Sequence, residues 1–112
     1  MIDNWGRLAI QGWCPGNDFV SSETGSGSGW LVQSAVLEED LLSQFRDGRL
    51  IDTASHTFET EIAGGKLVLG AELDGAPQLN MDVALVLVFD RALGVTEREG
   101  LQSYLEQRFF SP

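Results

Sequence analysis

Two pairs of carboxylates are the first places where this sequence could do chemistry. Glu59 and Glu61 alternate along an expected strand and so share one of its faces, and Glu72 and Asp74 stand two apart in an expected loop. Glycosidases use two facing carboxyl groups as nucleophile and acid. The strand pair lies on the polar side of its strand, and the loop pair lies among turn residues. Both pairs therefore fit a solvated acidic surface better than a catalytic dyad.

The single histidine and the single cysteine limit other catalytic chemistry. A triad would have to use His56 with Cys14 or one of several serines, and nothing in the spacing favours that. A zinc site needs three or four ligands, which one histidine and one cysteine do not supply. With one cysteine the chain forms no internal disulfide, and we expect Cys14 to be a small buried apolar residue. The sequence predicts a protein that is not an enzyme and has no cofactor.

Calcium is the alternative left open for a cofactor. Glu72, Asp74 and Asp82 lie within eleven positions around a loop with Gly and Pro, and residues 38–40 form a second acidic cluster. Calcium takes six to eight oxygen ligands, which carboxylates in loops can supply. The simpler interpretation is that these acids keep an anionic protein soluble, so we expect no metal at either cluster.

The charge balance excludes several classes of partner. The chain has 112 residues, 17 acidic and seven basic side chains, and a net charge of −10, with Lys66 as its one lysine. Nucleic acids and anionic lipid surfaces bind clustered Lys and Arg, so we expect neither partner. The longest apolar run, 83–89, is far shorter than the ~20 residues of a membrane-spanning helix. The N-terminus carries Asp3 where a signal peptide is basic, which predicts a cytoplasmic location by default and leaves export without a classical signal open.

Most of the chain alternates apolar and polar residues with the period of strands. The expected strands are 5–13, 30–37, 41–45, 49–53, 57–62, 66–69 and 81–89. Asp47-Gly48 between two such runs predicts a hairpin, because both turn positions need positive φ. We expect a mobile loop rich in Gly and Ser at about 14–29, inside a single domain that covers 1–112.

The final strand and the C-terminal segment break this pattern. Residues 81–89 are nearly all apolar, which predicts a strand through the middle of the core. Thr96 and Glu99 have the spacing of a capping box, and Leu101, Tyr104, Leu105 and Phe109 follow at helical spacing. The sequence predicts a mainly β, antiparallel fold with one amphipathic helix over about 97–109.

The C-terminal third resembles a known family. The run Asn80–Leu93, which ends in Phe-Asp-Arg-Ala-Leu, then Thr96–Glu99 and the pair Tyr104-Leu105 resemble the closing segment of LamG-like, concanavalin A-type jelly-roll domains. Upstream, Trp30 at the start of a strand, the hairpin Phe45–Leu50 and the strand Leu67–Ala71 occur in the order that this family has. The resemblance covers about residues 30–109.

The resemblance implies a shortened jelly roll of about six or seven strands. Met81 and Leu85 stand where family members usually have Gly and Glu, so the last strand is more apolar than expected. A complete sandwich of this type generally needs more chain before the strand that Trp30 opens. Unpaired sheet edges or uncovered apolar surface would then favour a homo-oligomer, with a symmetric dimer preferred. The Glu-x-Asp-x-Glu strand of related glycanases is absent.

The predicted function is a non-enzymatic binding module of concanavalin A-like type, with a carbohydrate or a protein as ligand. Exposed Trp side chains stack on sugars and anchor interfaces. We expect Trp30 in the core and Trp13, beside a Cys-Pro-Gly turn, at a binding surface together with Glu72 and Asp74. The alternative is a structural protein that self-associates through its sheet edges and binds no small ligand.

Overall fold

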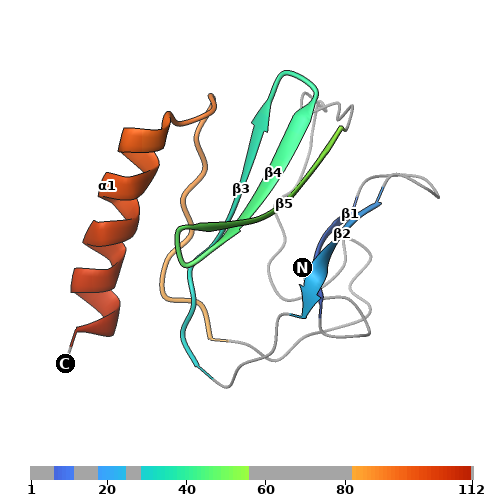
Figure 1. Ribbon diagram of the computed structural model, residues 1–112. Helices are drawn as coiled ribbons and strands as arrows, with labels where there is room; N and C mark the ends of the chain where they lie inside the picture. The colour runs from blue at the N-terminus through green and yellow to red at the C-terminus, as the bar shows by residue number, and fades with distance from the viewer. Residues whose placement is uncertain (1–6, 12–17, 25–28, 56–81, 112) are drawn as a thin grey trace, which may run out of the picture. The chain divides into compact units, whose positions relative to one another are not determined.

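A computed structural model of the chain describes residues 7–11, 18–24, 29–55 and 82–111 (Figure 1). Its elements are β1 (Arg7–Gln11), β2 (Asp18–Thr24), β3 (Gln33–Glu38), β4 (Leu41–Arg46), β5 (Arg49–Ser55), α1 (Val95–Leu105) and the π-helical turn η1 (Glu106–Phe110). The prediction of a mainly antiparallel β fold with one C-terminal helix is confirmed. The chain divides into two compact units, Met1–Phe58 with Asp90–Pro112, and Glu59–Phe89. The single concanavalin A-like domain over 1–112 stays a prediction.

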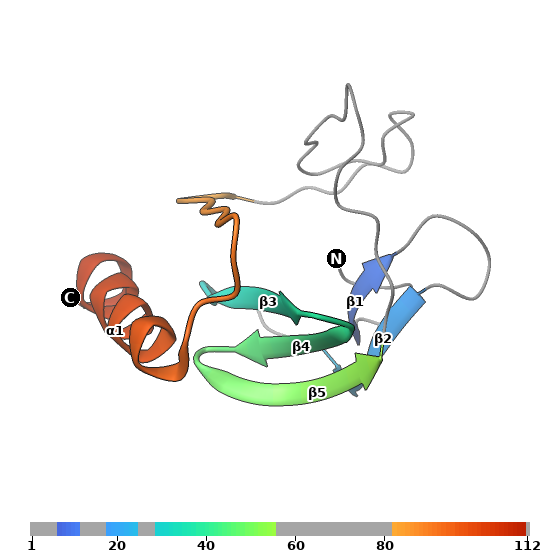
Figure 2. The same cartoon turned by 90° about the horizontal axis from the view of Figure 1, so that it is seen from above.

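The hairpin between β4 and β5 forms where the sequence predicts it. Asp47 and Gly48 adopt φ values of 49° and 76°, which are the positive values that a tight hairpin turn requires. β3 adds to the other edge of β4, so that β4 is the central strand of the antiparallel order β3-β4-β5 (Figure 2). This meander is built from hairpin connections alone, because each strand pairs with its neighbour in sequence.

A small buried cluster, half of it polar, joins β4 to β2. Alternate residues of β4, Leu42 and Gln44, are buried, as are Phe19 and Ser21 of β2. The spacing of two residues within each pair places both side chains on one face of their strand. Gln44 Nε2 donates a hydrogen bond of 3.1 Å to the carbonyl oxygen of Phe19, which links the two sheets through a buried amide.

Strand β2 corrects the prediction of a loop over about 14–29. Residues 18–24 pair with β1 in an antiparallel ladder, with Ile10 opposite Phe19. The sequence signal was Phe19 and Val20, a pair with high strand propensity between two turn-forming stretches. Burial of Phe19 supplies the tertiary contact that this short segment needs.

Helix α1 begins before the predicted capping box. Gly94 is the N-cap residue, and its backbone N–H donates a hydrogen bond of 2.8 Å to the carboxylate of Glu97. Arg91 makes a two-pronged ion pair with the same carboxylate, at 2.8 and 2.6 Å. The prediction of a capping box formed by Thr96 and Glu99 was therefore wrong. The ion pair with Arg91 favours Glu97 as the acidic residue that accepts a hydrogen bond from the N-cap backbone. The carboxylate also lies in the first turn, where the helix dipole favours negative charge.

The expected core strand over residues 81–89 is not present in the part of this segment that the structure describes. Residues 82–89 join no ladder, and their large apolar side chains are exposed, with Val88 at 78%. The prediction of a central strand was wrong for these residues, because strand propensity forms a strand only where a partner strand accepts its hydrogen bonds. The expected strands 57–62 and 66–69 lie outside the described residues. No helix in the described parts of the chain is long and apolar enough to cross a membrane.

Candidate functional site

An open hollow lies beside Trp30 in the unit that contains the β3-β4-β5 sheet and the helix. Its volume is about 570 Å³, and its lining residues are Trp30, Asp47, Glu106, Gln107, Phe110 and Ser111. Trp30 is 56% exposed, although the sequence analysis places it in the core. That prediction was wrong because β3 begins only at Gln33, so Trp30 precedes the paired residues that would bury it. The hollow therefore offers an accessible indole next to polar groups.

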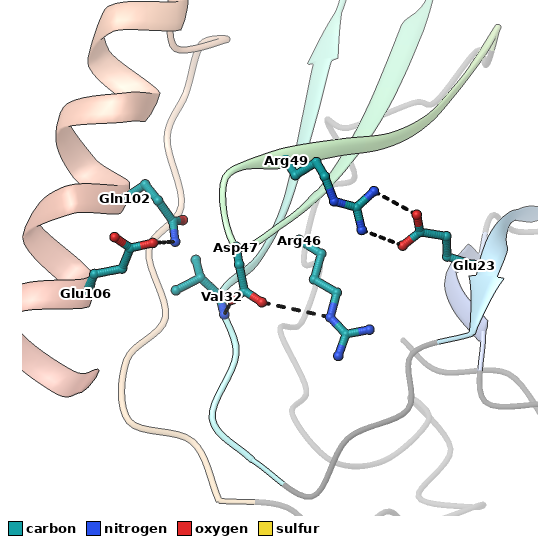
Figure 3. Close-up of polar contacts among 7 residues, drawn as sticks. All are labelled: Glu23, Val32, Arg46, Asp47, Arg49, Gln102 and Glu106. Atoms are coloured by element: carbon teal, nitrogen blue, oxygen red, sulfur yellow. Dashed lines mark hydrogen bonds and ion pairs between the residues drawn. The ribbon is translucent and has the colours of Figure 1, made fainter. Parts of the chain in front are cut away.

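The hairpin turn holds Asp47 at the hollow. Its Oδ1 accepts a hydrogen bond of 2.9 Å from the backbone N–H of Val32, and its own N–H donates to the Val32 carbonyl at 2.8 Å. Arg46 Nε lies 3.9 Å from Asp47 Oδ2 (Figure 3). These contacts fix the carboxylate and the residues just after Trp30 in one local structure. The sequence feature that places Asp47 here is thus the same Asp-Gly turn that forms the hairpin.

The last turns of the helical segment supply the other carboxylate. Glu106 Oε1 accepts a hydrogen bond of 2.9 Å from Gln102 Nε2, one turn earlier in α1 (Figure 3). Gln102 in turn approaches the hairpin, since a Cβ placed on Gly48 would stand 3.0 Å from its Cγ. This close approach explains how residues so distant in sequence line the same hollow.

A second contact positions the helix against the hairpin. The guanidinium of Arg98 lies 4.8 Å from the ring centroid of Phe45, within the range of a cation–π interaction. Its Nη1 also donates to the carbonyl oxygen of Leu93 at 2.6 Å. Arg98 therefore bridges the segment before α1 and strand β4, and it holds the first turns of the helix against the sheet.

The lining residues have the chemistry of a binding site. Trp30 and Phe110 present aromatic surface, Asp47 and Glu106 present carboxylates, and Gln107 and Ser111 present an amide and a hydroxyl. These groups can stack on a saturated ring and exchange hydrogen bonds with hydroxyl or amine groups.

A separate polar cluster ties β2 to β5. Arg49 donates hydrogen bonds of 2.7 and 2.8 Å to the two carboxylate oxygens of Glu23 (Figure 3), and Asp52 accepts one of 3.0 Å from the N–H of Ser22. The hydrogen bond from Arg49 lowers the pKa of Glu23, and the backbone hydrogen bond from Ser22 lowers that of Asp52. Both carboxylates are already partnered, so this cluster positions strands and carries no ligand chemistry.

The structure describes few of the residues that the sequence analysis selected. Trp13, Glu72 and Asp74 lie outside the described residues, as do His56, Cys14, Glu59 and Glu61. The acids at 38–40 are exposed at the turn between β3 and β4. Within residues 7–11, 18–24, 29–55 and 82–111, no group of three possible metal ligands occurs.

Most of the hollow was not predicted. Glu106 and Gln107 lie in the last turn of the helix predicted over about 97–109, and Phe110 and Ser111 lie beyond it. The exposure of Trp30 could have been predicted from Gly29. This glycine ends a Gly/Ser-rich stretch, which indicates that Trp30 precedes the strand.

Comparisons with known proteins bear on the fold alone. No family model matches the chain, and no curated protein does. A crystal structure of an S-layer domain-containing protein from Clostridium thermocellum (residues 221–444) is similar, with a TM-score of 0.61 and 16% sequence identity. The match covers 76% of this chain and 44% of that one, so this chain corresponds to less than half of its structural neighbour. The likeness to LamG-like domains stays a prediction.

Proposed function

We propose that this protein is a non-enzymatic binding module that recognises carbohydrate at the Trp30 hollow. The observation that supports the proposal most is an indole more than half exposed beside two carboxylates, an amide and a hydroxyl. An isolated exposed Trp is unremarkable, but one that borders a hollow with convergent polar groups fits ligand recognition. Sugars match these groups because a pyranose has an apolar face for the indole and equatorial hydroxyls for the rim.

The expected affinity is weak. The hollow is open, so a sugar keeps part of its hydration, and stacking on one indole contributes on the order of 1 kcal/mol beyond area burial. A short oligosaccharide should therefore bind with a Kd of roughly 0.1–1 mM, which corresponds to about 4–5.5 kcal/mol.

The test is a calorimetric titration of the protein with short oligosaccharides, repeated with Trp30→Ala. The matched control is Tyr104→Ala, because Tyr104 is also an aromatic residue, is 51% exposed and does not line the hollow. We expect loss of binding in the first variant and unchanged binding in the second. Equal binding by wild type and Trp30→Ala, with both folded, would contradict the proposed site.

Location and cofactors follow from the same proposal. Carbohydrate binding by carboxylates and an indole needs no metal, so we propose that neither EDTA nor calcium changes the affinity.

The cytoplasm is the default location that the sequence predicts. The name of the structural neighbour, an S-layer domain-containing protein, favours the cell surface as the alternative, and a surface location would suit a glycan ligand.

A second candidate function is self-association. Val83, Leu85, Val86, Leu87, Val88 and Phe89 are all more than 40% exposed and form an uncharged run. Exposed apolar runs of this kind favour contacts between protein chains. We propose a weak homodimer through this segment, which would be compatible with carbohydrate binding elsewhere. Sedimentation velocity across a range of concentrations tests it, and a monomer at the highest concentration would contradict it.

A further inference from the structure

We infer that the Trp30 hollow selects sugars that carry a protonated amine over neutral or acidic sugars. This inference rests on the proposed function and adds the class of ligand. Its first support is the charge of the lining, since Asp47 and Glu106 both contribute carboxylates and none of the lining residues is basic. An acidic sugar would meet two negative charges in the hollow, on a chain whose net charge is −10.

The helical backbone adds to the same field. Residues 106–111 contain the C-terminal end of the helical segment, where carbonyl groups without helical partners carry partial negative charge. A cation placed near Ser111 interacts favourably with this end, whereas an anion does not. The backbone and both carboxylates thus favour a positively charged ligand.

The aromatic residues favour a cation as well. Trp30 and Phe110 line the hollow together, and the face of an aromatic ring attracts an ammonium group through its quadrupole. The described part of the chain already uses this interaction elsewhere, with Arg98 over Phe45 at 4.8 Å and Arg108 over Phe109 at 5.5 Å. An indole beside two carboxylates is therefore a stronger site for an ammonium group than for a hydroxyl.

Three nearby groups already engage the carboxylates in part. Arg46 Nε stands 3.9 Å from Asp47 Oδ2, beyond hydrogen-bond distance, and Gln102 donates to one oxygen of Glu106. Asp47 Oδ1 is occupied by the N–H of Val32. Among the described residues, Glu106 Oε2 has no hydrogen-bond partner, which makes it the acceptor that we assign to the amine.

A sugar fits the hollow better than a lysine side chain does. Gln107 and Ser111 supply an amide and a hydroxyl, which can exchange hydrogen bonds with several hydroxyl groups. A lysine side chain has one polar group at its end and would leave these donors and acceptors to water. We therefore commit to an amino sugar, and peptide binding becomes an outcome of the test.

The experiment compares three oligosaccharides of equal length by calorimetry at mildly acidic pH. They are a glucosamine oligomer, its fully N-acetylated form and a galacturonic acid oligomer. We expect the glucosamine oligomer to bind at least about tenfold more tightly than the acetylated one, and the acidic oligomer not to bind. We also expect the preference to weaken as the salt concentration rises, because salt screens the attraction between the ammonium group and the two carboxylates.

Variants locate the preference in the two carboxylates. Glu106→Gln and Asp47→Asn should each reduce the preference for the amine by roughly three- to tenfold. Asn keeps an acceptor for Val32 and tolerates the positive φ at this turn position, so Asp47→Asn should fold. The control is Glu99→Gln, an exposed acid of α1 that does not line the hollow. A change in preference in this control would overturn the assignment to the hollow.

The outcomes separate the inference from the proposed function. Equal binding of the acetylated and free-amine oligomers would overturn the inference and leave carbohydrate binding intact. Failure of every sugar to bind would overturn both. Binding of a lysine-rich peptide with no binding of any of the three sugars would also overturn both, because the ligand would then be a peptide.

Discussion

The side-chain amide of Gln44 is buried where β2 meets the β3-β4-β5 sheet, and only one of its ends is satisfied. The residue is 1% exposed, its Nε2 donates to the Phe19 carbonyl, and its Oε1 has no hydrogen-bond partner among the residues that the structure describes. A buried acceptor without a donor costs about 1–3 kcal/mol, whereas the hydrogen bond that Nε2 makes contributes about 0.5–1.5 kcal/mol. The cost equals or exceeds the gain, so the polar groups add no net stability and the side chain stabilises the fold by filling space.

Two substitutions at this position separate volume from polarity. Gln44→Leu keeps most of the volume and removes both polar ends, so its free energy of unfolding should stay within about 1 kcal/mol of wild type. Gln44→Ala removes the same polar groups and leaves a cavity, which should cost about 2–3 kcal/mol. For a chain of this length the alanine variant should melt roughly 10 °C lower.

The assay is urea denaturation followed by far-UV circular dichroism, with a thermal melt of each variant as a second measure. The decisive quantity is the difference between Leu and Ala at position 44, about 2 kcal/mol in favour of Leu. If both variants lose the same stability, the hydrogen bonds of Gln44 matter more than its volume, and Oε1 has a partner such as a buried water.

Three further predictions follow from other contacts. Glu97 has a pKa of about 2, below its ordinary 4.5. Its contribution to the free energy of unfolding should therefore be complete above pH 4.5 and lost as the pH falls toward 2. In urea denaturation at a series of pH values, Glu97→Gln should lack this loss of stability in acid. Gly48→Ala should cost about 1–2 kcal/mol in a thermal melt because of its positive φ and the nearby Gln102, whereas Gly29→Ala, with open space around it, should not. Val86→Lys should lower self-association in sedimentation velocity, and Val95→Lys, another exposed apolar position, should leave it unchanged.

Features set by neighbouring residues could be predicted from the sequence. The turn Asp47-Gly48 forms as expected because its two residues tolerate positive φ at little cost, and the strands on either side need only each other to pair. The C-terminal helix was also expected. Its exact start was not, because Arg91 selects Glu97 rather than Glu99 through an ion pair outside the helix.

Features that depend on distant contacts could not be predicted. Apolar composition alone suggested that Trp30 and residues 83–89 are buried, yet burial requires a partner surface, and both are exposed. Phe19, placed in a loop by the sequence, is buried, and Gln44 of the distant strand β4 donates a hydrogen bond to its carbonyl oxygen. The hollow combines a hairpin turn with the end of a helix, and no local pattern shows that Asp47 and Glu106 share one site.

The central claim is that the Trp30 hollow binds carbohydrate, and an NMR titration tests it most directly. The indole N–H signal of Trp30, assigned with a Trp30→Phe variant, is followed together with the backbone amides of Glu106 and Phe110 while a glucosamine oligomer is added. We predict saturable shifts of all three signals with one Kd of roughly 0.1–1 mM. No shift of these signals at several millimolar sugar, in a folded protein, would contradict the claim.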